Sequence, residues 1–333
     1  MANGMASLMV GSSGLRSAQT ALNTTAHNLS NVNTQGYTRQ QVTFTDTTYA
    51  NVFSSSIVPG KYGLGVDIGA ISRVRNDFID RSYRTEYSRL GFYESQANAV
   101  YEVEDWFGEM QGVTYQQHIT DLYNSINELT KNPTSTIARS SLIQNATAFI
   151  DRSQAIYSGL KDYQITLNTE VSSMVDKINE LGQKIYSLNK SISKVEAGGV
   201  ERANDLRDTR DLALDELSQY LDIDYYETTD GQIIISAENI PFVSKSEVNT
   251  MDVRQEGQYG LLIPEWPAYE KDVFSFEKAA SNANNNDKGK LKGLLVARGT
   301  IDVNYQDVPV MPDKSDYDLT TAEGMAQYNS AMD

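Results

Sequence analysis

The chain has 333 residues and a formal net charge of −16, with 40% hydrophobic and 22% charged residues. This length suits about two domains of ordinary size. The 44 acidic residues outnumber the 28 basic ones, which argues against binding to the phosphate backbone of a nucleic acid. Its apolar runs are shorter than the roughly 20 residues of a membrane span, and without cysteine it has neither disulfides nor thiolate metal sites.

The first predicted element is a helix over residues 4–30. Leucines recur there every seven residues, with small or β-branched residues between them: Leu8, Leu15, Leu22 and Leu29, then Gly11, Ala18, Thr25 and Val32. This spacing predicts an a/d seam along one face of the helix. Because a lone amphipathic helix cannot bury its own apolar stripe and gains little stability in water, we expect this helix to need a partner helix.

The helix is predicted to end in an asparagine-rich turn, since these residue types tolerate left-handed backbone: Asn28, Asn31, Asn33 and Gly36. After the turn, Val42 and Phe44 alternate with polar residues, which predicts a strand or extended arm. Four glycines punctuate residues 59–74, and their spacing does not match a dinucleotide-binding loop. We interpret that stretch as a short strand pair.

Residues 76–220 are predicted to be helical, with breaks near 108–112, 132–133 and 198–199. The most regular apolar seam has alternating steps of four and three: Leu167, Val171, Met174, Ile178, Leu181, Ile185, Leu188, Ile192 and Val195. Its period of 3.5 residues predicts left-handed winding against neighbouring helices. A long coiled-coil rod or helical bundle is expected, with a third long helix after the last break.

Residues 222–264 carry strand patterns, with Asp230-Gly231 as a hairpin turn. The polar stretch 279–290 is predicted to be a loop or linker, and "LKGLLVARG" returns the chain to a packed element. Thr320 and Glu323 form a capping box that opens a last helix. Because the sequence stops about three turns later, we expect that helix to be truncated.

The predicted fold class is therefore mainly α with a smaller β part. It combines an N-terminal helical arm, a long helical bundle or coiled-coil domain, and a β-rich module after the third long helix. The predicted regions are 1–59, a helix and extended arm; 60–221, a helical domain that starts with a short β-hairpin; 222–278, the β-rich module; and 279–333, a linker, a return segment and the start of a helix.

Catalytic and metal-binding patterns find little support in the sequence. His27 and His118 each lack a second ligand at helical spacing, and neither a nucleophile elbow nor a phosphate-binding loop occurs. The densest charge cluster is Asp205, Arg207, Asp208, Arg210 and Asp211. Its aspartates would suit a metal, but alternating charges on a helix favour a solvated face or an interhelical ion-pair network. We predict no enzymatic activity, no cofactor and no metal site.

The segment "ALNTTAHNLSNVNTQGYTRQ", residues 21–40, resembles the N-terminal motif of the axial proteins of the bacterial flagellum. The matching positions are Asn28, Leu29, Asn31, Val32, Asn33, Thr34, Gly36 and Tyr37. Residues 63–84, 203–223 and 289–299 are similar to the hook-associated protein 1 family, the first hook–filament junction proteins. The resemblance covers most of the chain to about residue 300, whereas residues 300–333 match nothing recognisable.

This resemblance implies that the N-terminal helix pairs with a C-terminal helix to form an inner tube domain, and that the chain stops before that C-terminal helix. The implied assembly interface is Leu8, Leu15, Leu22, Leu29 and Val32, and the motif turn at Asn28, Asn31, Asn33, Gly36 and Tyr37 would redirect the chain from the inner tube to the outer domain. The implied partners are a ring of like subunits, hook protein, a second junction protein on the filament side and an export chaperone. Export would pass through the flagellar type III secretion channel to the extracellular flagellum, which fits an N-terminus without the features of a cleaved signal peptide.

Two other classes of function compete with this structural role. A secreted coiled-coil adhesin or effector would account for the seam of residues 167–195 and for the acidity, but not for the motif turn. A glycosidase with paired carboxylates has no specific support, because among 44 acidic residues some pair can always be found.

Overall fold

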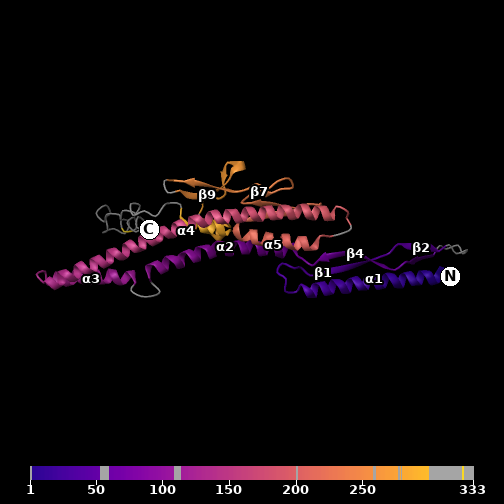
Figure 1. The fold of residues 1–333 in the computed structure, drawn as a ribbon, viewed down its shortest axis with the longest axis horizontal. Helices are drawn as coiled ribbons and strands as arrows, with labels where there is room; N and C mark the ends of the chain where they lie inside the picture. The colour runs from indigo at the N-terminus through magenta and orange to yellow at the C-terminus, as the bar shows by residue number, and fades with distance from the viewer. Residues whose placement is uncertain are drawn as a thin grey trace.

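The computed structural model describes residues 2–52, 60–108, 114–199, 202–257, 260–276, 278, 280–299 and 325. Figure 1 shows an elongated molecule in which a narrow N-terminal part continues the long axis of a helical part. We name these the arm (residues 2–75) and the body (residues 76–299). The helix predicted from Thr320 onward lies outside the described residues, apart from Met325. None of the helices in the described ranges has the length and apolarity needed to cross a membrane.

The arm consists of one helix and a long antiparallel ribbon: α1 (Ala2–Ser30), β1 (Gln40–Asp46), β2 (Tyr49–Val52), β3 (Gly60–Gly63) and β4 (Val66–Arg73). The predicted first helix and the strands after it are confirmed. The interpretation of residues 59–74 as a strand pair is wrong, because β3 pairs with β2 and β4 pairs with β1. The strands of this stretch therefore continue the arm and do not form a hairpin that opens the helical part.

Apolar residues pair across the ribbon and explain why its register joins distant segments. Val42 lies opposite Ile71, and Phe44 lies opposite Ile68. Cross-strand pairs of this kind stabilise an antiparallel sheet. A shift of register between Thr43 and Phe44 marks an irregularity of β1.

The body contains the remaining helices: α2 (Asp77–Phe107), α3 (Tyr115–Lys131), α4 (Thr136–Glu196), α5 (Asn204–Tyr220) and α6 (Lys290–Arg298). Their ends lie where the sequence predicted breaks. Asn76 caps the start of α2 by accepting hydrogen bonds from the amides of Phe78 and Ile79, and Gly108 ends it in the left-handed conformation. Ser135 caps α4 in the same way, through the amide of Ala138.

The strands of the body form two three-stranded antiparallel sheets, in the orders β5-β6-β7 and β10-β9-β8. Figure 1 shows β7 and β9 lying along α4. The predicted hairpin turn at Asp230-Gly231 joins β5 to β6, and Gly231 takes a positive φ of 78° there. The elements are β5 (Ile223–Glu227), β6 (Ile233–Ala237), β7 (Ile240–Val243), β8 (Asp252–Glu256), β9 (Leu261–Trp266) and β10 (Lys271–Asp272), with short 3₁₀ turns at Pro267–Tyr269 and Asn282–Asn284.

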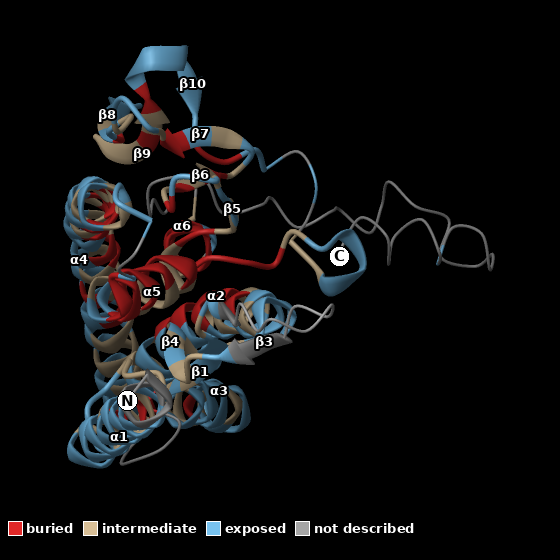
Figure 2. Ribbon diagram, turned by 90° about the vertical axis from the view of Figure 1, so that its right-hand side faces the viewer, coloured by how far each residue is buried: buried red, intermediate tan, exposed pale blue. Residues whose placement is uncertain are grey.

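The hydrophobic core lies where α4, α5, α6 and the two body sheets meet, and it includes Ile178, Leu217, Phe242, Trp266 and Leu294. The seam of α4 is buried at Leu167, Val171, Met174, Ile178, Leu181, Ile185 and Ile192, which confirms its prediction over most of its length. In Figure 2 the buried residues are concentrated in α5, α6 and the inner strands, whereas α1 is largely exposed.

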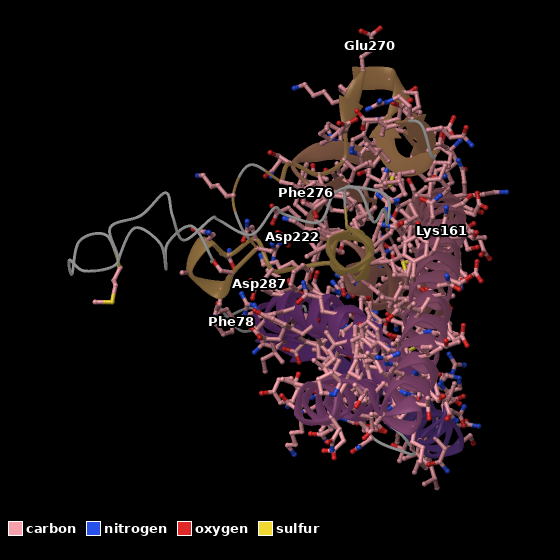
Figure 3. The ribbon with its side chains drawn as sticks, turned by 90° about the vertical axis from the view of Figure 1, so that its left-hand side faces the viewer. Phe78, Lys161, Asp222, Glu270, Phe276 and Asp287 are labelled. Carbon is pink, nitrogen blue, oxygen red and sulfur yellow. The ribbon has the colours of Figure 1, made fainter. Side chains whose placement is uncertain are left out.

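Within the polar stretch predicted as a loop or linker, residues 280–289 form a loop with one 3₁₀ turn, and the end of this loop is buried in the body. Asp287 is fully buried and accepts a hydrogen bond of 2.9 Å from the hydroxyl of Tyr93 on α2. The Lys288 ammonium binds the carboxylate of Asp222 at 3.0 Å. Figure 3 shows Asp222 and Asp287 near each other at the side of the helical layer, far from Glu270 at the outer tip of the β-rich part. The loop therefore anchors α6 to the body and is not a free linker.

Candidate assembly interface

One face of α1 and the turn after it carries a continuous apolar stripe. Every side chain of the predicted interface is at least 70% exposed: Leu8, Leu15, Leu22, Leu29 and Val32. Burying one leucine side chain stabilises a structure by about 1.5–3 kcal/mol. Covering this stripe with a partner helix would therefore contribute several such amounts of free energy to association. Exposed apolar surface of this extent marks an interaction site.

The opposite face of α1 holds the helix against the ribbon through small polar side chains, which the sequence reasoning missed. The hydroxyl of Ser13 accepts a hydrogen bond from the amide of Val66 at 3.2 Å, and the hydroxyl of Ser17 donates one to the carbonyl of Val66 at 3.2 Å. Ser17 and Thr24 are buried. The serines recur four residues apart, a spacing that places them on one helical face and could have indicated this contact. The ribbon covers this polar face of α1, and the leucines point to solvent.

The motif turn is organised by the side chain of Asn28, which pairs with the backbone at the start of β1. Its amide donates to the carbonyl of Gln40 at 2.8 Å, and its Oδ1 accepts from the Gln40 amide at 2.9 Å. The same Oδ1 accepts from the hydroxyl of Tyr37 at 2.7 Å, while that hydroxyl lies 2.9 Å from Nδ1 of His27. Burial, together with the carboxylates of Asp205 and Asp208, raises the pKa of Tyr37 above its ordinary value.

The remaining motif residues shape the turn itself. Asn31 donates from its side chain to the carbonyl of His27 at 3.0 Å, and Thr34 donates to the Asn31 side chain at 3.2 Å. Asn33 is exposed. Gly36 has a φ of +79°, and a Cβ added there would lie 3.2 Å from Cβ of Leu212 on α5. Both its conformation and its close approach to α5 require glycine.

The expected role of this turn needs correction. It does not pass the chain to the outer part of the molecule, because β1 follows it and runs back along α1. The chain enters the body only after β4, at Asn76. The hydrogen bonds between Asn28 and Gln40 explain the reversal, since they tie the end of α1 to the first residue of β1.

The acidic side chains of α5 bind two segments of the arm, the turn after α1 and the end of β4 with the residues that follow it. Asp208 accepts from the amide of Thr38 at 3.0 Å and from Nη1 of Arg73 at 2.8 Å. Asp211 accepts from Arg73 at 2.6 Å and from Arg75 at 3.1 Å. We call these five residues the joint.

The arginines of α5 face a different set of partners. Arg207 binds Glu196 and Glu227 at 2.7 and 2.6 Å. Its hydrogen bonds lower the pKa of Glu196 to about 2. Arg210 is fully buried and donates to the Gly231 carbonyl at 2.6 Å, and burial lowers its pKa to about 10. The prediction of an ion-pair network for the 205–211 cluster is therefore confirmed. The alternative of a solvated helix face is wrong, because the charged residues of this cluster are buried except for Asp205.

The two histidines lie apart and serve local contacts. His27 belongs to the motif turn, and His118 is half-buried on α3. Within the described ranges, His, Asp and Glu side chains do not gather in groups of three or more that could hold a metal ion.

Two of the grooves beside α1 lie near the motif turn. One, of about 880 Å³, lies along the contact of α1 with β1 and continues the stripe through Leu29 and Val32 to Val42 and Phe44. The other, of about 1080 Å³, is a cleft between the arm and the body, lined by Thr20, His27, Ile68 and Ala70 on one side and by Val195, Arg202 and Leu206 on the other.

Comparison with known proteins identifies relatives of this arrangement. Residues 100–311 match the model of the flagellar hook-associated protein FlgK helical domain, and residues 8–38 match that of the flagella basal body rod protein. The chain is 29% identical to flagellar hook-associated protein 1 of Bacillus subtilis over 95% of its length, and 27% identical to that of Escherichia coli over 68%. It spans 64% of the first relative's length and 41% of the second's.

A solved structure shares the fold. The flagellar hook junction protein FlgK from Burkholderia pseudomallei aligns with 66% of this chain and 38% of its own, at a TM-score of 0.50 and 18% identity. The likeness shows that the helical body with its smaller β part is a known architecture.

Proposed function

Because the chain belongs to the family of the flagellar hook-associated protein FlgK helical domain, we propose that it is a structural subunit of the junction between the flagellar hook and filament. The names of its relatives support this role, since they are hook-associated or hook junction proteins. The family is one of structural flagellar proteins, and a role without catalysis follows from it. Nothing in the comparisons supports the alternative of a secreted adhesin.

The observation that carries the proposal is the exposed stripe of α1. A helix that turns four leucines to solvent while binding its own ribbon through serines and threonines is built for assembly. Leu8, Leu15, Leu22, Leu29 and Val32 form the contact with other helices in the assembled tube. The motif turn of Asn28, Asn31, Asn33, Gly36 and Tyr37 holds α1 in the orientation that presents them.

The partners follow from the same role. Like subunits form a ring, hook protein lies on one side of it, and a second junction protein lies on the filament side. An export chaperone and the flagellar type III secretion channel deliver the chain unfolded to the outside of the cell. The low charge of α1, whose only Lys or Arg is Arg16, suits passage through a channel.

The test replaces Leu22 with Asp and asks whether filaments still grow. An unpaired carboxylate buried against another helix costs several kcal/mol, which is enough to empty an assembly held by modest contacts per subunit. In the free chain the same side chain is solvated, so the body should stay folded. Complementation of a non-motile deletion strain measures assembly, and electron microscopy should show hooks without filaments.

Asn23→Asp is the matched control, because it adds the same charge one residue further along α1, about 100° around the helix. It should swim like the parent. A Leu22→Asp strain with normal filaments would show that the stripe does not face the tube interface.

A further inference from the structure

The arm is attached to the body through charged groups rather than through apolar packing. Asp208 is buried, yet the groups that bind it are the Thr38 amide and the Arg73 guanidinium, both from the arm. Asp211 binds Arg73 and also Arg84, which lies on α2 of the body. On α5, the carboxylate of Asp208 therefore binds groups of the arm, and the carboxylate of Asp211 binds groups of both the arm and the body.

The arm lies outside the hydrophobic core. The core cluster consists of residues from position 167 onward, all of them in the body. Near the joint, Gly36 of the arm lies so close to α5 that an added Cβ would be 3.2 Å from Cβ of Leu212. Two-stranded ribbons are at best marginally stable by themselves, so the position of the arm depends on what holds its two ends.

A cleft separates the arm from the body beside the joint. It holds about 1080 Å³ and opens between α1 and β4 on one side and the α4–α5 connection on the other. Because this space is not filled by packed side chains, the arm has room to rotate about the joint. Hydrogen bonds from Asn204 to the Ile71 carbonyl at 3.0 Å and from Gln40 to Asp205 at 3.3 Å also join the two parts. The joint differs from them because it pairs opposite charges from the arm and the body, and such charge-assisted bonds are the stronger ones.

We propose that the carboxylates of Asp208 and Asp211 act as an ionic latch that holds the arm at one angle to the body. With the latch closed, the arm and the cleft keep a single geometry. When the pairs with Arg73 and Arg75 are removed, the arm swings about the joint while the body stays folded. In the ring proposed above, and only if that function holds, the latch would give every subunit the same arm direction before α1 is buried.

The chain has no cysteine, so pairs of introduced cysteines can be spin-labelled without background. Thr43→Cys on β1 and Ala197→Cys at the end of α4 place exposed labels on the arm ribbon and on the body. Double electron–electron resonance on the full chain then measures the distribution of distances between the two labels. A single narrow distribution is expected in the otherwise unaltered chain.

Asp208→Ala opens the latch from the body, and Arg73→Ala opens it from the arm. Each should widen the distance distribution about twofold, and because the two residues share one network, the double variant should widen it little further. Asp215→Ala is the matched control. Asp215 also lies on α5 and binds an arginine at 2.7 Å, but that arginine is Arg84 of the body. This control should destabilise the body and leave the distribution narrow.

Three results would overturn the latch: a broad distribution in the parent, an unchanged one in both latch variants, or equal widening in Asp215→Ala. If Asp208→Ala fails to fold, Arg73→Ala alone decides, because Arg73 belongs to the arm. Loss of the latch would leave the assembly role standing, since the Leu22 variant tests that role separately.

Discussion

At the scale of single residues, α5 divides its charges between two faces. Asp205, Asp208 and Asp211 are spaced three apart and point to the arm, while Arg207 and Arg210 point to the end of α4 and to the β5–β6 turn. The spacing of three was visible in the sequence and predicts a shared face. Its partners were not predictable, because Arg73 lies more than 130 residues away along the chain.

The same geometry leads to a prediction about metals. Because arginines already occupy the carboxylates of Asp208 and Asp211, we expect purified protein to contain no stoichiometric metal. Elemental analysis of the protein after dialysis measures this directly. A bound metal that disappears in Asp208→Ala would contradict the ion-pair assignment.

Burial moves the titration of Glu238 toward neutral pH. It lies in the turn between β6 and β7, where its Oε1 accepts a hydrogen bond of 3.2 Å from the amide of Asp222. Burial raises the pKa of Glu238 from 4.5 to about 7. The Asp222 amide, Lys292 and Lys288 act in the opposite direction, and the Asp222 carboxylate adds to the rise.

Because the folded chain binds the Glu238 proton more tightly than the unfolded chain does, this group favours folding most below pH 4.5. That contribution is lost as the pH rises through about 7, and the full difference amounts to at most about 3 kcal/mol. Glu238→Gln removes the penalty, so it should be more stable than the parent at pH 8 and equally stable near pH 4.5. Urea denaturation at both pH values checks the difference. Glu247→Gln, at an exposed position, is the control, and a pH-independent effect of Glu238→Gln would contradict the burial of the carboxylate.

At the scale of elements, the apolar seams of α4 and α1 have the same period but differ in burial. The seam of α4 is buried against α5, α6 and the strands of the body, whereas the stripe of α1 is exposed. Periodicity predicted both helices and both seams, because it depends only on side chains that recur on one face. It could not predict what covers each seam, since that depends on elements elsewhere in the chain or in another subunit.

The exposed stripe predicts how α1 behaves before assembly. Amphipathic helices are held mainly by packing, and the leucines of α1 lack packing partners in the free chain, where each is at least 70% exposed. Hydrogen exchange on the monomer should therefore be fast at the amides around Leu15 and Leu22 and slow around Ile178 and Ile185. After assembly the amides of α1 should become protected. Strong protection of α1 in the monomer would show that the ribbon alone holds the helix.

The ribbon of the arm shows where local sequence patterns stop being informative. Alternation at Val42 and Phe44 predicted a strand correctly, and glycines marked the return strands. Nearby strands were expected to pair with each other, yet β4 pairs with β1 more than 20 residues earlier. Strand pairing is decided by which apolar faces match, and the matches of Val42 with Ile71 and of Phe44 with Ile68 join strands that are separated along the chain by β2 and β3.

At the scale of the whole molecule, the described residues of the body form a hydrophobic core to which those of the arm do not contribute. The core cluster joins α4, α5, α6 and strands of both body sheets, so the helical and β-rich parts share buried side chains. Parts that share one core unfold together, whereas segments with few buried contacts open independently. The predicted boundary near residue 222 separates helical from strand-rich sequence. Because both sides contribute to one core, we expect the two regions to unfold together.

This sharing can be tested at Ile178, which is fully buried in the middle of α4. Ile178→Ala should lower the free energy of unfolding of the body by about 2–5 kcal/mol, because it removes buried methyl groups and leaves a cavity. Trp266 on β9 is buried in the same core, and the second tryptophan, Trp106, lies on α2. In a Trp106→Phe background, fluorescence therefore reports on the β-rich part, while circular dichroism reports on the helices. Both signals should shift together to lower denaturant in Ile178→Ala, and Leu22→Asp on the arm should shift neither. Separate transitions for Trp266 fluorescence and helical circular dichroism would mean that the β-rich part folds as a unit of its own, and that the contacts of α4 with β6, β7 and β9 do not couple the two.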